Sequence, residues 1–441
     1  MKSFIIIGGG ASGVLVAAQL LRRSDSARVR IFESSGELGQ GIAYSTENPR
    51  HLLNVRASNM SAFPDKPDDF VDWLRKQNQP TENEAWLPQS FAPRCMYRTY
   101  LQNLLAPYLT ECPARIVVET SEAVDIDFIQ GKPEVTSATG QIYSADALII
   151  ATGNETAIRT STEHVTEYWS SNGYFDLADD QPVAIFGTGL SMVDSVISLL
   201  DSGFTGKIYA ISRRGLLPAS HKTSHSVEIN RDALPMHDGA IGLLKFLRNM
   251  MRKHDDWRSV IDGLRPHTQH IWAGLSPSQR ASFLRHLRPW WDVHRHRMAP
   301  EIFDRIAAAR HSGQLQLLAA QLISVRKEKT NIRITYRKRR HNNPEEISVG
   351  NIIDCRGGNP RFSTTRNPAL ISLMERGLAR PDSCDLGLDV TDRLEIVDQH
   401  GNVAGKVFAL GPITKGVFWE VTAIPDIRNQ AEKIAVTLLD G

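Results

Sequence analysis

The sequence is poor in cysteine. Its 441 residues contain four, at Cys95, Cys112, Cys355 and Cys384, and no two of them form a CxxC pair. Scattered single cysteines argue against a disulfide framework and against a zinc ribbon, and they are typical of proteins kept in a reducing compartment. We therefore expect a cytoplasmic protein with no structural metal site.

Long apolar runs and a charge imbalance are also missing. No stretch reaches the roughly 18 apolar residues that a membrane span needs. The apolar N-terminal run carries only Lys2 as a charge and lacks a small-residue cleavage site, which is unlike a signal peptide. With 51 Lys and Arg against 49 Asp and Glu, the formal net charge of +2 favours neither a nucleic-acid nor a membrane partner. We expect small-molecule partners and, from the length, about three domain-sized units.

The N-terminal residues predict a dinucleotide-binding turn. An apolar strand at 4–7 leads into Gly8-Gly9-Gly10-Ala11-Ser12-Gly13 and then into a helical pattern. Gly8 lets the chain reverse, Gly10 removes the Cβ that would block a pyrophosphate, and Gly13 allows close packing of helix on strand. Glu33 ends the second apolar run, where its carboxylate can accept both ribose hydroxyls of an adenosine.

Further candidates follow the next strands. A glycine-rich loop that contains Gly41 comes directly after Glu33. Residues 115–150 alternate like short antiparallel strands and end in an apolar strand that runs into Thr152 and Gly153. Because ligands bind at the carboxyl ends of strands in open α/β sheets, we expect these small residues to approach a bound nucleotide.

Two polar segments offer hydrogen bonds and cations. The loop with Asn54 and Arg56 suits a flat ring system that needs a few hydrogen bonds. A predicted helix then carries Arg94 and Arg98. These arginines would bind an anionic group, or they are solvated surface residues.

The order of strand, glycine turn and helix returns at residues 182–194. Here Gly187 and Gly189 form the turn, and Ser191 opens the helix. A repeat on this scale predicts a second nucleotide-binding domain.

The second copy differs from the first at the ribose position. Registering the copies on their middle glycines pairs Glu33 with Ser212, and Arg213 and Arg214 follow. A carboxylate repels a 2′-phosphate, whereas hydroxyl and guanidinium groups bind it. The second site therefore predicts NADPH rather than NADH, with two solvated arginines as the alternative.

Residues 220–315 differ in composition from the segments on either side, and their apolar residues show helical spacing. Within them, 283–297 combines aromatic residues with arginines and histidines. His294 and His296 are not neighbours on a helix face, which disfavours a metal site. We expect a helical insertion that caps the cleft and offers cations to an anionic substrate or cofactor, with packing in a homodimer as the alternative. The basic run 337–340 is interpreted as a solvated hairpin tip.

The C-terminal stretch returns to the first domain. A last strand ends at Gly411 and Pro412, and the segment through Trp419 leads into a final helix. The N-terminus of that helix would face the pyrimidine side of a flavin, where a reduced ring carries negative charge.

Together these motifs resemble the bacterial FAD/NAD(P)-binding protein family, which is similar more distantly to the class B flavin monooxygenases and the microbial N-hydroxylating monooxygenases. The resemblance implies an α/β fold of two Rossmann-like domains, one for FAD and one for NADPH. The expected domains are 1–155 with 352–441 for FAD, and 156–351 for NADPH with the insertion at about 220–315. The implied FAD contacts are Gly8, Gly10, Gly13, Glu33, Gly411 and Pro412, and the implied NADPH contacts are Gly187, Gly189, Ser191 and Arg213.

The resemblance also implies a reaction. NADPH would reduce the flavin, oxygen would give a C4a-hydroperoxyflavin, and a substrate nitrogen or sulfur would attack it; N-hydroxylation of an amine or amino acid is the expected outcome. Asn54 would hydrogen-bond the flavin or peroxide, and Arg56, Arg94 and Arg98 would hold a substrate carboxylate. A flavin oxidoreductase without oxygen insertion and a non-catalytic dinucleotide sensor are the alternatives.

Overall fold

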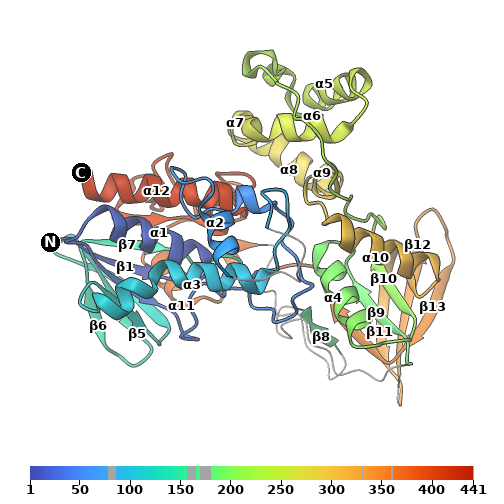
Figure 1. Ribbon diagram of the computed structural model, residues 1–441, viewed down its shortest axis with the longest axis horizontal. Helices are drawn as coiled ribbons and strands as arrows, with labels where there is room; N and C mark the ends of the chain where they lie inside the picture. The colour runs from blue at the N-terminus through green and yellow to red at the C-terminus, as the bar shows by residue number, and fades with distance from the viewer. Residues whose placement is uncertain (78–85, 156–164, 169–179, 330, 359–360, 441) are drawn as a thin grey trace.

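Two α/β halves lie side by side, and a group of helices projects above them (Figure 1). The computed structural model describes residues 1–77, 86–155, 165–168, 180–329, 331–358 and 361–440. No helix in these ranges is long and apolar enough to cross a membrane.

The first half is built on a six-stranded sheet with the order β15-β16-β7-β1-β2-β3. All neighbours run parallel except β15, which is antiparallel to β16. The strands are β1 (Ser3–Ile7), β2 (Arg28–Phe32), β3 (Ile116–Glu119), β7 (Ala147–Ile150), β15 (Glu395–Val397) and β16 (Val403–Ala409).

Both faces of this sheet are covered, which explains why β1 is an unbroken apolar run. Phe4 and Ile6 join one core, and Ile5 and Ile7 join the other. Helices α1 (Ala11–Arg23), α2 (Asp69–Lys76), α3 (Arg94–Glu111) and α12 (Ile424–Asp440) contribute to the first core. Helix α11 (Pro368–Glu375) and the antiparallel strands β4 (Ala123–Ile129), β5 (Lys132–Ser137) and β6 (Ile142–Ser144) cover the opposite face.

One strand direction differs from the prediction. β3 pairs with β2 in parallel, with Ile116 beside Val29, so it is an edge strand of the large sheet and not part of an antiparallel hairpin. Burial of Ile116 in the first core stabilises this pairing. Alternating apolar residues cannot distinguish the two directions, because both have a side-chain period of two.

The second half has a seven-stranded sheet with the order β13-β12-β11-β10-β9-β14-β8. Its strands are β8 (Val165–Glu167), β9 (Val183–Phe186), β10 (Ile208–Ser212), β11 (Leu315–Lys327), β12 (Ile332–Lys338), β13 (Pro344–Val349) and β14 (Asn351–Asp354). β14 pairs with β9 in parallel, so the chain returns to the first half after Asp354, slightly later than the predicted boundary at 352. Helices α4 (Leu190–Asp201) and α10 (Pro300–His311) pack on this sheet around one core.

The predicted insertion is helical. Its helices are α5 (Gly239–Lys253), α6 (Trp257–Leu264), α7 (Thr268–Gly274), α8 (Pro277–His286) and α9 (Arg288–Arg295). They surround a separate core in which Trp272 is buried. The predicted range also contains α10, which belongs to the second half because Ile302 and Ile306 pack in the core of its sheet.

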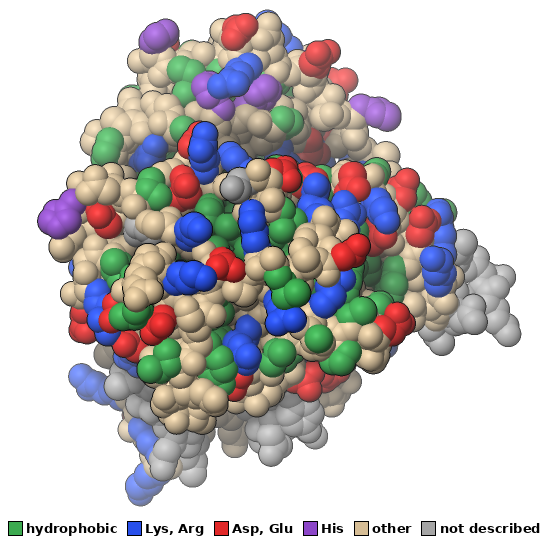
Figure 2. All heavy atoms as spheres, turned by 90° about the vertical axis from the view of Figure 1, so that its left-hand side faces the viewer, with side chains coloured by type: hydrophobic (Ala, Val, Ile, Leu, Met, Phe, Trp, Pro, Cys, Tyr) green, Lys and Arg blue, Asp and Glu red, His purple; other side chains and the backbone are tan. Residues whose placement is uncertain are grey.

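The end of the molecule formed by the first half shows Lys and Arg side chains interspersed with Asp and Glu (Figure 2). Among the described residues on this face, neither sign of charge forms a continuous patch.

Candidate functional site

Two glycines of the first turn, Gly8 and Gly13, leave no room for a side chain. A Cβ at Gly13 would lie 1.9 Å from the Gly8 carbonyl oxygen, and a Cβ at Gly8 would lie 2.5 Å from the Ala151 oxygen. Helix α1 begins at Ala11, and among the described residues no side chain caps its N-terminus. The positive end of the helix dipole is therefore available to a pyrophosphate.

The C-terminal return meets this turn, although the two are far apart in the chain. A Cβ at Gly411 would lie 2.3 Å from the Ser12 hydroxyl, in the first turn of α1. Gly41, from the loop after Glu33, also lies close to this turn, because its Cα is 3.5 Å from the position of a Cβ at Gly10. Pro412 is buried next to Gly411. Tertiary folding thus brings together predicted FAD residues from three segments.

Glu33 is held at the end of β2. Its Oε2 accepts the backbone N–H of Gly9 at 3.0 Å, and its Oε1 accepts the N–H and hydroxyl of Ser35 at 3.1 and 2.8 Å. The carboxylate therefore has one fixed position beside the glycine turn, as the ribose contact predicted for it requires.

Replacing Glu33 with alanine should weaken FAD retention by about 1.5–3 kcal/mol, the cost of a hydrogen bond to a charged group. The measurement is flavin release from the purified protein by equilibrium dialysis. Ser35→Ala is the matched control, because it removes a partner of the carboxylate and not the carboxylate itself. Flavin retention equal to that of the wild type would remove Glu33 from the FAD site.

A buried polar atom fits a ligand at the same place. The Thr152 hydroxyl, just beyond the end of β7, is buried without a hydrogen-bond partner in the described part of the chain. An unsatisfied buried hydroxyl is costly unless something else pairs with it. Beside it, a Cβ at Gly153 would meet no described atom within 4 Å. These residues fit a dinucleotide at the end of the sheet.

The second glycine turn repeats the geometry of the first. A Cβ at Gly187 would lie 2.7 Å from the Cys355 oxygen, whereas one at Gly189 meets no described atom within 4 Å. Ser191 lies in the first turn of α4. The Ser212 hydroxyl lies 2.9 Å from that of Thr188 and accepts the N–H of Gly215 at 3.0 Å.

The two arginines after Ser212 have different surroundings. Arg214 donates to the backbone oxygens of His286 and Arg285 at the end of α8, at 3.0 and 3.4 Å. Arg213 is exposed and lines a pocket. Arg214 therefore anchors the insertion, and Arg213 is the better candidate for a 2′-phosphate contact.

Arg94, predicted to hold substrate, instead joins the two halves. Its guanidinium lies 2.9 Å from Asp194 of α4, and the two side chains are 14% and 8% exposed. Tyr168 donates to the same carboxylate at 3.0 Å, and His51 Nε2 lies 3.0 Å from the Asp194 backbone oxygen. Burial opposes the charge of Arg94, but Asp194 and nearby tyrosines raise its pKa. This buried polar cluster was not recognised in the sequence, where its members are widely separated.

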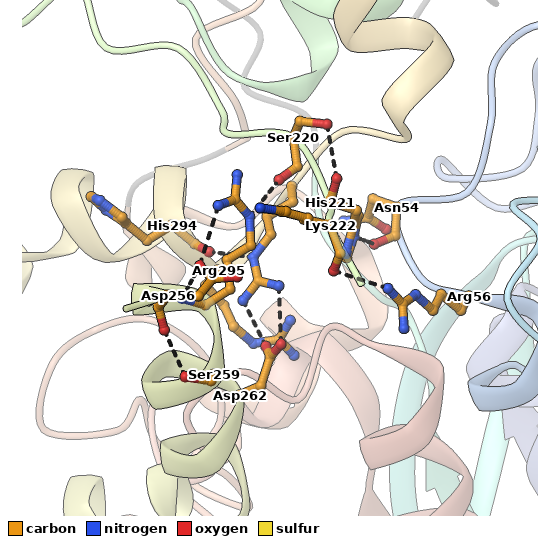
Figure 3. A network of polar contacts seen from close by, with 12 residues as sticks. Asn54, Arg56, Ser220, His221, Lys222, Asp256, Ser259, Asp262, His294 and Arg295 are labelled. Atoms are coloured by element: carbon orange, nitrogen blue, oxygen red, sulfur yellow. Dashed lines mark hydrogen bonds and ion pairs between the residues drawn. The ribbon is translucent and has the colours of Figure 1, made fainter. Parts of the chain in front are cut away.

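The remaining predicted substrate residues make other contacts. Arg98 pairs with Glu47 at 2.8 Å. Arg56 donates to the Lys222 backbone oxygen at 3.1 Å, and the Asn54 backbone oxygen lies 3.0 Å from His221 Nε2 (Figure 3). The loop around Asn54 thus contacts the segment that leads into the insertion. Unlike Arg94 and Arg98, Arg56 forms no ion pair with a carboxylate among the described residues.

Acid should destabilise the fold through His221, because protonation would place a charge on a buried ring. Burial, helped by the charges of Arg297 and Arg56, lowers the pKa of His221 from 6.5 to about 4, against the opposing effect of its hydrogen bond to Asn54. Neutral His221 therefore contributes stability above about pH 6.5 that is lost as the pH falls towards 4, about 1–3 kcal/mol in all. His221→Gln keeps a donor without the titration, so its unfolding free energy should fall less between pH 7 and 5. Parallel pH profiles for the two proteins would contradict this role.

The insertion is attached to the C-terminal return. Trp272 of α7 stacks on Trp419 with ring centroids 4.6 Å apart and donates to the Gly416 oxygen at 2.8 Å. Glu420 receives hydrogen bonds from Trp291 and Arg295 of α9. The Trp419 ring nitrogen is buried without a partner among the described residues. Arg295 therefore anchors the insertion, and the predicted contact of Trp419 with a cofactor stays a prediction.

The N-terminal part of the chain matches a known family. Residues 5–155 match the model of the FAD-NAD(P)-binding family. This segment is similar to an FAD-NAD(P)-binding domain. The match covers the first glycine turn, Glu33, the Gly41 loop and Thr152, and it confirms the resemblance that those motifs predicted. Within the described ranges, no group of three or more His, Cys, Asp or Glu could hold a metal ion.

Curated relatives cover parts of the chain. The uncharacterized protein YdhS of Escherichia coli is 25% identical over 218 residues, which are 45% of this chain and 39% of that protein. A salicylate hydroxylase of Pseudomonas putida is 25% identical over 173 residues, 37% of this chain and 38% of the enzyme. The alignments thus span about two-fifths of the length of these relatives.

Solved structures match the fold of nearly the whole chain, and not only that of its N-terminal segment. DfoA of Erwinia amylovora, a cadaverine monooxygenase bound to FAD, has a TM-score of 0.70 at 12% identity, covering 100% of this chain and 95% of its own. The ornithine hydroxylase PvdA of Pseudomonas aeruginosa has a TM-score of 0.68 at 14% identity, covering 99% and 98%. At this identity the likeness concerns the fold, and it confirms the predicted arrangement of two Rossmann-like units.

Proposed function

We propose that this protein is an FAD-dependent, NADPH-using monooxygenase that hydroxylates the nitrogen of a small amine or amino acid. The observation that carries the proposal is the pair of glycine turns in one chain. Each follows a strand that is paired in parallel on both sides, and each precedes a helix whose N-terminus no described side chain caps. Two such turns suit a bound flavin and a nicotinamide coenzyme that reduces it. The fold shared with the ornithine and cadaverine enzymes supports the choice of reaction.

In this proposal the flavin supplies the redox and oxygen chemistry, and the chain binds, orients and excludes water. The first turn of α1 would hold the FAD pyrophosphate, Glu33 the ribose, and the Thr152 hydroxyl would donate to the dinucleotide. Gly189 would leave room for the NADPH pyrophosphate. The helical insertion, fixed to the C-terminal return through Trp272 and Glu420, would shield the cleft.

Arg56 is the proposed contact for an anionic group of the substrate. It lies where the Asn54 loop meets the segment that leads into the insertion. Among the described residues, its hydrogen bond goes to the Lys222 backbone oxygen. Arg94 does not fit this role because Asp194 already neutralises it. Asn54 stays the proposed polar neighbour of the flavin.

The deciding experiment mixes FAD-loaded protein anaerobically with NADPH and then with oxygen and a panel of ornithine, lysine and cadaverine. A monooxygenase is expected to bleach the flavin rapidly and to yield hydroxylated amine in proportion to the NADPH consumed. Flavin reduction with only hydrogen peroxide or another reduced acceptor as product would favour an oxidoreductase without oxygen insertion. No bleaching would favour a dinucleotide sensor.

A further inference from the structure

A basic pocket lies beside the second glycine turn. Its volume is about 330 Å³, and its lining residues are Arg213, Gln321, Arg337, Lys338, Arg339, Arg340 and His341. The sequence predicted the run 337–340 to be a solvated hairpin tip, whereas folding places it against Arg213.

Strand register explains this position. Ser212, the last residue of β10, is level with Ala319 of β11. The next residue of β11, Ala320, pairs with Lys338 at the end of β12, and the Arg339 N–H donates to the Ala319 oxygen at 2.7 Å. The basic end of the hairpin is therefore adjacent to the tip of β10. In a dinucleotide-binding fold, that tip is where the adenosine ribose lies.

Most of the charge in this pocket is not neutralised by the protein. Lys338 pairs with Glu345 at 2.7 Å, and Arg337 donates to the neutral Gln321 at 3.0 Å. In the described part of the chain, no ion pair joins Arg213, Arg339 or Arg340 to a carboxylate. Unpaired guanidinium groups that converge on one pocket suit a compact dianion, because each can donate charge-assisted hydrogen bonds to its oxygens.

We propose that Arg339 and Arg340, together with Arg213, bind the 2′-phosphate of NADPH. The inference rests on the NADPH site of the proposed function and assigns coenzyme selection to the β12–β13 hairpin in addition to the residue pair after Ser212. It also replaces Arg214 in that role, because Arg214 is engaged with the end of α8. A nucleic-acid surface is disfavoured because the cations gather around one partly open pocket beside a coenzyme fold and do not form an extended track.

The test uses the FAD-loaded protein with Arg339→Gln and Arg340→Gln combined. Glutamine removes both charges and keeps most of the side-chain length. At position 340, where φ is +67°, the backbone strain is the same for glutamine as for arginine. The matched control combines Arg326→Gln with Arg333→Gln. It removes two charges that face each other across β11 and β12, at the end of β12 away from the pocket, where Arg333 pairs with Glu328 and Glu346.

Titration calorimetry should compare 2′,5′-ADP, which carries the 2′-phosphate, with 5′-AMP, which lacks it. The pocket variant is expected to bind 2′,5′-ADP about ten- to a hundredfold more weakly, with unchanged 5′-AMP binding and an unchanged control. Its preference for NADPH over NADH in flavin reduction should fall by a similar factor.

The inference would be overturned if the pocket variant bound 2′,5′-ADP as tightly as the wild type, if it bound both nucleotides equally more weakly, or if the control variant lost the same affinity. It would also be overturned if the pocket variant lost affinity only for a single-stranded DNA oligonucleotide, measured in the same way. Binding of 2′,5′-ADP requires neither flavin reduction nor oxygen. A protein that selects 2′,5′-ADP but produces no hydroxylated amine would therefore retain this inference and refute the proposed function.

Discussion

Replacing Asp194 with alanine is expected to lower the free energy of unfolding by about 3–5 kcal/mol, because a buried guanidinium then loses its partner. The Arg94 and Asp194 side chains are 2.9 Å apart and almost fully buried between the two halves of the molecule. The same substitution removes the acceptor of the Tyr168 hydroxyl. Arg94 and Tyr168 would each lose one buried polar contact, which adds to the loss.

Urea unfolding of the FAD-loaded protein would measure this effect. Glu47→Ala is the matched control, since it removes the partner of Arg98 at a position where Glu47 is 76% exposed, and it should cost no more than about 1 kcal/mol. The double variant Arg94→Met, Asp194→Leu should recover much of the lost stability, because apolar residues of similar volume can replace a buried ion pair. Equal losses for Asp194→Ala and Glu47→Ala would show that the buried pair contributes little.

Replacing Gly13 with alanine is expected to cost at least about 3 kcal/mol and to abolish flavin retention. The added methyl would lie 1.9 Å from the Gly8 carbonyl oxygen. That oxygen cannot retreat easily, because Gly8 directly follows β1, which is paired on both sides by β2 and β7 in the middle of the sheet. Helix α1 would have to move away from the strand, and its N-terminus would no longer point at the pyrophosphate.

Gly10→Ala separates folding from cofactor binding. Gly10 has φ −67°, which alanine adopts readily, and its Cβ would stay 3.5 Å from Gly41. This variant should fold with wild-type stability but retain little flavin, since its methyl would occupy pyrophosphate space. Thermal unfolding and flavin content per chain measure both effects. Full flavin retention by Gly13→Ala would refute the steric argument, and full retention by Gly10→Ala would place the pyrophosphate elsewhere.

The parts of the fold that were predictable depend on local sequence. Each unit of strand, glycine turn and helix lies within about 20 residues, and its backbone reversal is a requirement of the turn itself. Strand direction was harder to predict from the sequence: β3 was predicted to be antiparallel, but it pairs in parallel with β2. The prediction of a helical insertion was correct, but its end was misplaced because α10 is amphipathic in the same way and packs on the second sheet.

The sequence by itself determined that the chain has two glycine turns between strand and helix, and that only the first copy has an acid, Glu33, after its second strand. Only the tertiary structure decided the partner of each arginine. Arg94 joins Asp194, Arg214 caps the end of α8, and Arg213 meets the basic end of the hairpin. The physical reason is that a glycine turn is specified by neighbours within the segment, whereas an ion pair depends on strand register and helix packing between residues far apart in the chain.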